Sequence, residues 1–442
     1  MMGLYQRFIV AAAVLTALVV PAQAAPTIQR WQTDGGATVV FVPTSELPIV
    51  DVRLTFDAGS ARDGDKPGLA RLTSNLLLEG TDERSAGEIA RAFERLGARV
   101  STGSERDTGA ISLRSLTRGD VLGEVIGEFA EVIANPAFPP DAVARSKRQM
   151  QVSLRQDQQS PRALAEKAFA EALYRDHPYA SPPKGTRESV EALDRDAVQG
   201  FYERYYTAAN ATLAIVGDIS RERAEAMASR ITGGLPDGEA APELPAVPPL
   251  DSAKTVRVAF DGEQTQVLMG QTGVSRDHDD YFPLYVANHV LGGSGLVSML
   301  TDAMRNQRGL SYSTYSVMAP MRQSGRFVVG SKVRNDALGE ALSVMRGILK
   351  DFHKDGPSAD RLSAAKSNIT GSFPLDIDSN QDIVNYIGMI GFHGLGSDYL
   401  DRLPERVEAV GRKEATQAFR EHIDPERFVT VLVGPEDVIG AQ

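Results

Sequence analysis

The chain repeats itself once, and this duplication constrains its fold more than any other feature of the sequence. Residues 59–63 (GSARD) return as residues 273–277 (GVSRD). Residues 201–218 (FYERYYTAANATLAIVGD) return, at nearly the same spacing, as residues 419–436 (FREHIDPERFVTVLVGPE). Each copy therefore begins with a strand that ends in G-x-x-R-D and ends with a strand that leads into Val-Gly.

A proline-rich stretch separates the two copies. Residues 233–252 (GGLPDGEAAPELPAVPPLDS) carry no helical or strand pattern and are typical of an extended linker. A chain of 442 residues is also too long for one ordinary hydrophobic core. We therefore predict two homologous domains, residues 25–232 and 253–442, joined by a linker at 233–252.

Each copy contains both strand-like and helix-like patterns. Residues 39–42, 50–56 and 110–116 are apolar or alternating and rich in β-branched side chains, which predicts strands. Apolar side chains recur at helical spacing around Phe93, and a longer helical stretch runs through residues 139–158. Because strands cluster and groups of helices follow them, we predict an α+β fold with a mixed, mainly antiparallel sheet in each half and helices packed on one face.

Residues 1–24 have the pattern of a cleaved signal peptide. Arg7 precedes the apolar run 8–20, and residues 22–24 (AQA) form an A-x-A cleavage signal. The apolar run is shorter than the ~20 residues that cross a bilayer, and no later stretch approaches that length. The chain has no cysteine, which suits an oxidising compartment. We expect an exported protein of a bacterial periplasm with no membrane span; a buried N-terminal helix is the alternative.

The composition excludes several classes of function. Without cysteine the chain can form no disulfide, thiolate metal site or cysteine nucleophile. Its 47 basic and 58 acidic side chains include no dense basic run, so we expect no nucleic-acid partner. The six histidines are the remaining soft metal ligands, and no two of them have the spacing of a helical zinc pair. His278 lies among three aspartates, and we interpret this run as a solvated turn.

Four segments resemble the pitrilysin/insulinase family of zinc metallopeptidases. They are residues 48–63 (PIVDVRLTFDAGSARD), 68–81 (GLARLTSNLLLEGT), 177–186 (HPYASPPKGT) and the strand end at 216–218 (VGD). Their order and spacing are similar to those of the family, and the resemblance covers essentially the whole chain beyond the signal peptide, duplication included. It implies two halves that face one another as a clamshell around a chamber, and a link to zinc-dependent peptide hydrolysis.

The zinc-binding motif of that family is missing. The positions of H-x-x-E-H read RLTSN here, so the resemblance places Arg71 and Asn75 where the histidine ligands belong and Ser74 at the glutamate base. The third ligand, a glutamate eight residues before a helix-breaking proline, falls on Ser153. Zinc requires imidazole or carboxylate ligands, whereas Arg71 carries a permanent positive charge. We therefore expect the N-terminal domain to bind no zinc and to hydrolyse no peptide by itself.

A second motif of the family is kept in the C-terminal half. The pattern R-x-x-x-G-L-x-Y is present with Arg305 as its arginine and Tyr312 as its tyrosine. In the family this pair reaches the substrate near the scissile bond, where donors that are fixed in advance stabilise the negative charge of the transition state. Outside this motif the pair would be interpreted as a surface arginine and a packed tyrosine. We interpret Arg308 as a solvated charge at a helix end.

The resemblance implies an active site that two subunits share, because some bacterial members of the family are heterodimers with H-x-x-E-H on one subunit and the Arg–Tyr pair on the other. We interpret this chain as the Arg–Tyr subunit of a periplasmic peptidase that hydrolyses peptides. It would bind no cofactor and be inactive alone, and a homologous H-x-x-E-H partner subunit would supply the zinc. The alternatives are a non-enzymatic scaffold or peptide-binding protein of the same fold, and an unrelated α+β periplasmic binding protein. The retained pair Arg305 and Tyr312 favours the first interpretation.

Overall fold

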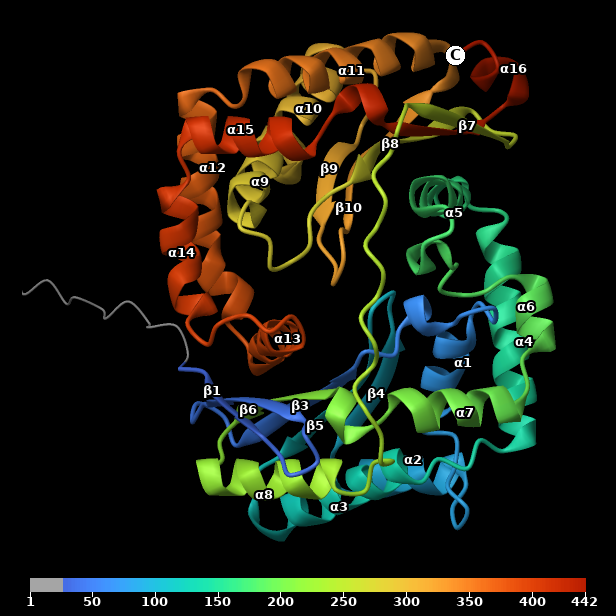
Figure 1. Ribbon diagram of the computed structural model, residues 1–442, viewed down its shortest axis with the longest axis vertical. Coiled ribbons are helices and arrows are strands. Elements are labelled where there is room, and N and C mark those ends of the chain that lie inside the picture. Colours follow the sequence, from blue (N-terminus) through green and yellow to red (C-terminus); the bar gives the residue numbers. More distant parts are fainter. Residues whose placement is uncertain (1–26) are drawn as a thin grey trace, which may run out of the picture.

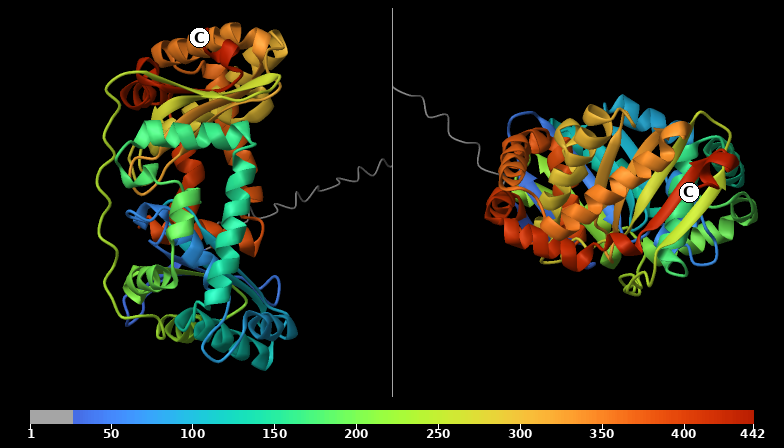
Figure 2. Two further views of the ribbon diagram at one scale, coloured as in Figure 1. Left: turned by 90° about the vertical axis from the view of Figure 1, so that its right-hand side faces the viewer. Right: turned by 90° about the horizontal axis from the view of Figure 1, so that it is seen from above.

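The computed structural model describes residues 27–442, which form two halves that face one another (Figure 1). The predicted signal peptide lies outside the described residues. Each half contains one β-sheet with helices packed against it (Figure 2). The prediction of an α+β fold in two homologous halves is confirmed.

The N-terminal half contains six strands and eight α-helices. Its strands are β1 (Gln29–Gln32), β2 (Thr38–Pro43), β3 (Ile49–Phe56), β4 (Arg99–Ser104), β5 (Gly109–Leu116) and β6 (Ala211–Gly217). Its helices are α1 (Leu69–Leu76), α2 (Ala86–Arg95), α3 (Gly119–Ala134), α4 (Pro140–Asp157), α5 (Pro161–Tyr174), α6 (Arg187–Ala192), α7 (Arg195–Tyr205) and α8 (Arg221–Thr232). The strands predicted from periodicity are β2, β3 and β5, and the long predicted helix is α4, so these predictions are confirmed.

The C-terminal half repeats this order of elements. Its strands are β7 (Lys254–Ala259), β8 (Gln264–Thr272), β9 (Thr314–Ala319), β10 (Arg326–Arg334) and β11 (Val429–Gly434). Its helices are α9 (Tyr281–Asn288), α10 (Met299–Thr301), α11 (Leu338–Asp355), α12 (Ala359–Ser372), α13 (Asn380–Phe392), α14 (Tyr399–Ala409), α15 (Arg412–His422) and α16 (Glu436–Ile439). Among residues 27–442, no helix combines the length and the apolarity that a membrane crossing requires.

The two sheets share one topology. The strand order β2-β6-β3-β5-β4 of the first sheet is repeated as β7-β11-β8-β10-β9 in the second, and β1 is an additional edge strand of the first sheet. In each sheet one pair is parallel, β2 with β6 and β7 with β11, and the other pairs are antiparallel. The duplication seen in the sequence is therefore a duplication of fold, and each sheet is mixed and mainly antiparallel as predicted.

The two halves exchange equivalent helices. Helices α5 and α13 are each the third of the run of helices that follows the hairpin, β4–β5 in one half and β9–β10 in the other. Helix α5 packs against β7, β8 and β11 of the C-terminal sheet, and α13 packs against β2, β3 and β6 of the N-terminal sheet. Each sheet is thus covered on one face by its own helices and on the inner face by a helix from the opposite half (Figure 1).

Close packing of α13 depends on a glycine. A Cβ atom at Gly391 would lie 2.6 Å from Thr212 Cγ2 and 2.7 Å from Val40 Cγ2, so only glycine lets the helix lie this close to the N-terminal sheet. The neighbouring Ile387 is fully buried in a core that also contains Val40. Because apolar side chains from both halves share this core, separating the halves would expose apolar surface to water.

The connection between the halves runs in an extended form along the outside of the molecule (Figure 2). It is nevertheless attached at several points. The Leu244 carbonyl accepts a hydrogen bond from Gln323 Nε2 at 3.0 Å, and the Pro245 carbonyl lies 2.9 Å from His177 Nε2. Since His177 belongs to the N-terminal half and Gln323 to the C-terminal half, the connection contributes to the contact between them.

The loop between β9 and β10 reaches into the N-terminal half and ends at two buried aspartates. Arg322 Nη1 lies 3.0 Å from Asp57 Oδ2, and the Arg322 backbone N–H donates to Asp107 Oδ2 at 2.9 Å. Asp57 is also paired with the buried Arg62, through two bonds of 2.7 Å. Tyr179 donates its hydroxyl to Asp107 Oδ1 at 2.6 Å. The two bonds from Arg322 join the halves, and the aspartates that accept them are buried.

Candidate functional site

Helix α1 carries the positions that the family motif assigns to zinc. It begins at Leu69 after Gly68, and the carboxylate of Asp63 accepts the backbone N–H groups of Gly68 and Ala70 at 2.8 Å each. Asp63 is the last residue of the first G-x-x-R-D segment, so this segment fixes the N-terminus of α1. Helix α1 packs against α4, which carries Ser153.

Three of the four substituted positions line one cavity, which we call the α1–α4 pocket. It has a volume of about 350 Å³. Its lining includes Arg71, Asn75 and Ser153, together with residues that the sequence did not single out: Glu79, Thr102, Arg145, Ser146, Gln149, Met150 and Lys184. The fourth position, Ser74, is buried beside the pocket in α1, and its Oγ has no hydrogen-bond partner among the described residues.

The lining of the α1–α4 pocket does not fit a zinc ion. None of the six histidines belongs to it, and its one carboxylate, Glu79, is paired with Arg145. Arg71 Nη1 lies 3.5 Å from the Ser104 carbonyl, and Asn75 Nδ2 lies 3.5 Å from Ser146 Oγ. A zinc site needs several neutral imidazoles or carboxylates at ~2 Å, whereas this pocket offers cations, amides and hydroxyls.

The described residues bring three metal-ligand side chains together elsewhere. Ligand atoms of His278, Asp280 and His422 lie within 4.8 Å of one another. His422 Nε2 is 2.8 Å from Asp280 Oδ2, and His278 Nδ1 accepts the Asp280 backbone N–H at 3.0 Å. His278 is exposed in a turn, as the sequence indicated, but His422 lies in the distant helix α15 and could not be associated with it from spacing alone.

Arg305 and Tyr312 form a stacked pair at the surface of the C-terminal half. Arg305 lies in a π-helical turn, Asp302–Gln307, and Gly309 follows with a φ of 63°, a left-handed conformation that ends helices and favours glycine. The Arg305 Cζ atom is 4.5 Å from the centroid of the Tyr312 ring, within the range of a cation–π contact. Tyr312 is 80% exposed.

Buried hydroxyl groups fix the backbone on both sides of Tyr312. Ser331 Oγ donates to Ser311 Oγ at 3.0 Å and lies 2.9 Å from Thr314 Oγ1. All three residues are buried. The chain beside Tyr312 is therefore anchored while the ring projects into solvent. The sequence signal for this anchor is the run of serine and threonine residues around two tyrosines in 311–316 (SYSTYS).

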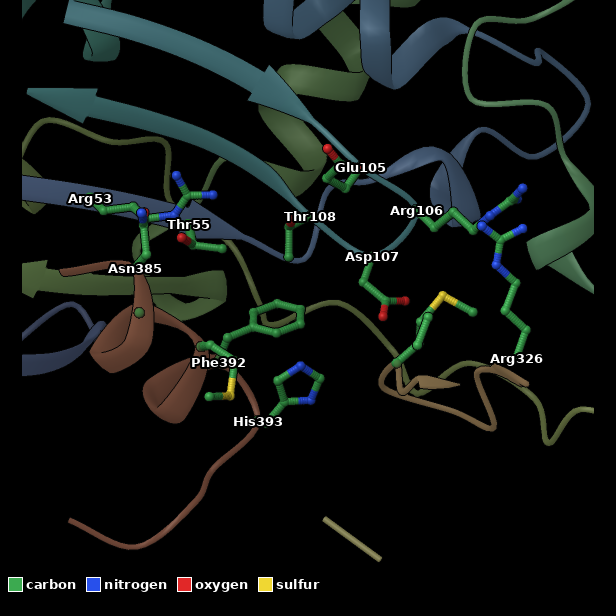
Figure 3. Close-up of a pocket in the computed structure, with 14 residues that line it drawn as sticks. Arg53, Thr55, Glu105, Arg106, Asp107, Thr108, Arg326, Asn385, Phe392 and His393 are labelled. Atoms are coloured by element: carbon green, nitrogen blue, oxygen red, sulfur yellow. The ribbon is translucent and has the colours of Figure 1, made fainter. Parts of the chain in front are cut away.

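A second cavity lies between the two halves (Figure 3). It has a volume of about 460 Å³, with Arg53 at one end and Arg106 and Arg326 at the other. His393 also lines it, and burial, assisted by the positive charges of Arg276 and Arg322, lowers the pKa of His393 to about 4. Sequence reasoning did not identify this cavity, because its walls come from β3, the two hairpins and the exchanged helix α13.

The Arg–Tyr pair and the substituted zinc positions stay apart in this chain. Neither Arg305 nor Tyr312 is among the described residues that line the α1–α4 pocket or the cavity between the halves. In one copy of the chain, Arg305 and Tyr312 therefore form no part of the pocket that holds the substituted zinc positions.

The buried carboxyl group of Asp63 gives α1 a pH-dependent stability. Burial raises the pKa of Asp63 from 3.8 to about 7, although the N–H groups of Ala70 and Gly68 oppose this shift. The folded protein thus holds this proton more tightly than the unfolded chain, and the resulting stability is lost as the pH rises through 7. We therefore expect the urea midpoint of Asp63→Asn to rise relative to that of the wild type as the pH is raised from 4 to 8. Asp65→Asn, at an exposed position, serves as the control; equal midpoint differences at all pH values would contradict the assignment.

The two halves exchange helices, and the pocket at the position that the motif assigns to the metal lacks the ligand set of a zinc centre; together these features define a metallopeptidase homologue. Residues 38–187 match the family described as Insulinase (Peptidase family M16), and residues 192–369 match the Peptidase M16 inactive domain. A crystal structure of a peptidase M16 inactive domain from Pseudomonas fluorescens has 34% sequence identity and a TM-score of 0.89, and the match covers 92% of this chain and 98% of that chain. The chain belongs to peptidase family M16, and its resemblance to the insulinase family is confirmed.

The names of other relatives differ in what they say about activity. The Bacillus subtilis protein named "Uncharacterized zinc protease YmxG" is 22% identical, over 89% of this chain and 97% of its own length. The Helicobacter pylori protein named "Non-peptidase homolog YmxG" is 24% identical, over 87% of this chain and 89% of its own length. A crystal structure of a Helicobacter pylori protease, with 18% identity and a TM-score of 0.83, covers 93% of this chain and 100% of that chain and shows likeness of fold alone.

Proposed function

We propose that this chain is the substrate-binding, active-site-completing subunit of a heterodimeric zinc metallopeptidase that hydrolyses peptides in the periplasm. A homologous partner subunit would contribute H-x-x-E-H and the zinc. The observation that carries the proposal is the stacked pair of Arg305 and Tyr312, which is held by buried groups and open to solvent. A pair that served only the stability of this chain would need neither the anchored backbone nor the exposed ring.

The surface beside the pair is suited to being covered by a second protein. Leu296 and Val297 are 66% and 72% exposed, which is unusual for apolar side chains of this size. Arg361 connects their loop to the turn that carries Arg305, because its guanidinium donates to the Val297 carbonyl at 3.2 Å and pairs with Asp302 at 3.1 Å. The exposed apolar loop is thus linked through Arg361 to the turn that carries Arg305.

The chemistry assigned to this chain is stabilisation of charge. In the assembled enzyme, the partner's zinc would polarise the scissile carbonyl and lower the pKa of the attacking water. The Arg305 guanidinium would donate N–H groups to the oxyanion that develops, and the Tyr312 hydroxyl would donate to the same oxygen or to a neighbouring carbonyl. The contact with the Tyr312 ring restricts the guanidinium before substrate binds, which reduces the reorganisation needed in the transition state.

The second candidate is a non-enzymatic peptide-binding or scaffold protein of the same fold. The name of the Helicobacter pylori relative, a non-peptidase homologue, favours this alternative. A scaffold would keep the cavity between the halves but would place no demand on Arg305. The two candidates therefore make different predictions: substitution of Arg305 lowers the activity of a complex if this chain completes the active site, and leaves it unchanged if the chain is a scaffold.

Reconstitution tests the proposal directly. We expect the purified chain to hydrolyse no peptide alone, and a mixture with an H-x-x-E-H homologue from the same organism to hydrolyse peptides. A zinc assay on the single chain should include His422→Ala, so that metal held by His278, Asp280 and His422 is distinguished from metal in the α1–α4 pocket. Hydrolysis by the single chain, or inactivity of every mixture with a zinc-loaded homologue, would exclude the subunit role.

A further inference from the structure

The charges that line the α1–α4 pocket are compensated with one exception. Arg145 is paired with Glu79 and lies 3.3 Å from Asp141. Lys184 Nζ lies 2.7 Å from Asp157 Oδ2. Arg71 forms no ion pair with any residue that the structure describes, and its one hydrogen-bond contact is the long one to the Ser104 carbonyl. The pocket therefore presents one uncompensated positive charge.

We infer that the α1–α4 pocket binds a carboxylate, the C-terminal carboxylate of a peptide. An arginine fork matches the two oxygens of a carboxylate, and such charge-assisted bonds are about twice as strong as neutral ones. The amides of Asn75 and Gln149 and the hydroxyl of Ser153 line the same pocket and can donate to the remaining lone pairs. A single free cation suits a singly charged carboxylate.

The surface next to the pocket has room for the residues that precede this carboxylate. Another cavity, of about 570 Å³ and distinct from the one between the halves, adjoins the α1–α4 pocket at Lys184, which lines both. Its other walls include apolar side chains from the end of α4, from α5 and from the loop that follows: Leu154, Ala163, Leu164, Ala170, Pro182 and Pro183. Charged side chains, among them Arg106, Glu166 and Arg187, also line this cavity. The basic pocket thus opens into a mixed cavity whose apolar walls can hold apolar side chains next to the C-terminal carboxylate of a peptide.

The loop that forms the outer wall is held rigidly. It belongs to the segment 177–186 (HPYASPPKGT), one of the four on which the family resemblance rests. Gly185 has a φ of 75°, and a Cβ atom there would lie 2.5 Å from the Pro67 carbonyl oxygen. Ser189 Oγ donates to the same carbonyl at 2.8 Å, directly before α1 begins. The wall is thus fixed to the N-terminus of the helix that carries Arg71, so the pocket exists before any ligand binds.

The inference goes beyond the proposed function, since binding of a peptide end in this pocket would require neither the partner nor its zinc. It takes from the proposed function only that peptides are the ligands. The substitution of arginine for a metal ligand then has a chemical consequence: a position typical of a metal ion becomes a receptor for an anionic group.

Binding measurements on the purified full chain test this. The probes are a fluorescein-labelled hexapeptide with apolar C-terminal residues as its free acid, the same peptide as its C-terminal amide, and an amide whose last residue is glutamate. We expect fluorescence anisotropy to show the free acid binding about 10- to 100-fold more tightly than the plain amide, as expected for hydrogen bonds to a charged group. Arg71→Gln should remove the difference, and Arg91→Ala, at an exposed position on α2, should retain it.

A second variant covers the case in which Arg71→Gln disturbs the fold. Ser153→Glu places a carboxylate in the pocket opposite Arg71 and should also abolish the preference for the acid. Equal binding of acid and amide by the wild type, or a preference that survives both variants, would overturn the inference. Tight binding of the glutamate amide would overturn the assignment to the peptide terminus in favour of an acidic side chain. If a reconstituted pair cleaves peptides while the single chain shows no preference, this inference fails and the proposed function stands.

Discussion

Replacement of Arg305 with alanine is expected to lower the kcat of the reconstituted peptidase by ~10²–10³-fold, the usual effect of removing one oxyanion donor. The Arg305 side chain stacks on an exposed tyrosine ring and is not part of the core, so its removal should leave the fold of this subunit intact. If the donor acts in the transition state alone, kcat and kcat/KM should fall together. Steady-state kinetics of the H-x-x-E-H subunit mixed with a saturating amount of the Arg305→Ala subunit measures both kcat and kcat/KM.

The controls for this experiment lie in the same segment. Arg308→Ala removes an exposed charge, bonded to the side chain of Gln307, and should change kcat by less than twofold. Tyr312→Phe keeps the ring under the guanidinium but removes the O–H donor, so it should lower kcat while leaving the stacking in place. Full activity of the Arg305→Ala complex would leave the pair with a structural role only and would favour the scaffold alternative.

Replacement of Asp57 with alanine is expected to destabilise the protein by ~3–5 kcal/mol, the range found when one partner of a buried ion pair is removed. The Asp57 carboxylate receives two bonds of 2.7 Å from Arg62, and both side chains are almost inaccessible, at 4% and 5% exposure. Alanine would leave the Arg62 guanidinium buried without its counter-charge. The variant would also lose the bond from Arg322, which joins the β9–β10 loop to the N-terminal half.

Urea denaturation followed by circular dichroism measures this effect. Asp261→Ala, an exposed aspartate, is the control and should change stability by less than ~0.5 kcal/mol. Because the halves exchange helices α5 and α13, we expect one cooperative transition for both proteins. A loss below ~1 kcal/mol, or a loss in the Asp57→Ala/Arg62→Ala double variant that equals the sum of the two single losses, would show that the pair is solvated in solution.

Much of the fold could be predicted from the sequence because its signals are local. The apolar alternation of residues 50–56 and 110–116 records which faces of β3 and β5 carry apolar side chains, and the helical spacing of residues 139–158 records one buried face of α4. The duplication then applies the same architecture to the second half. Even so, periodicity shows that a face is buried without showing what buries it, and for this reason the exchange of α5 and α13 could not be foreseen.

The candidate site, too, could be predicted from the sequence only in part. Arg71, Asn75 and Ser153 could be aligned with the zinc positions of the family, and three of the four substituted residues do line one pocket. The residues that give this pocket its charge balance, Glu79 and Lys184, lie in two of the segments that resemble the family, but the sequence does not show that they pair with Arg145 and Asp157. Their importance depends on distances across α1, α4 and the loop before α6, which only packing determines.

The sequence by itself determined that the chain is a duplicated peptidase M16 fold, that ligands for zinc are missing at the expected positions, and that Arg305 and Tyr312 keep the spacing of the family motif. Residue identity and local spacing are enough for these conclusions, because a side chain either can or cannot bind a metal. The tertiary structure alone decided that Tyr312 is exposed, that Arg71 lacks an ionic partner among the described residues, and that Asp57 joins the two halves. Exposure and charge compensation arise from groups far apart in the chain, so they exist only after folding brings those groups together.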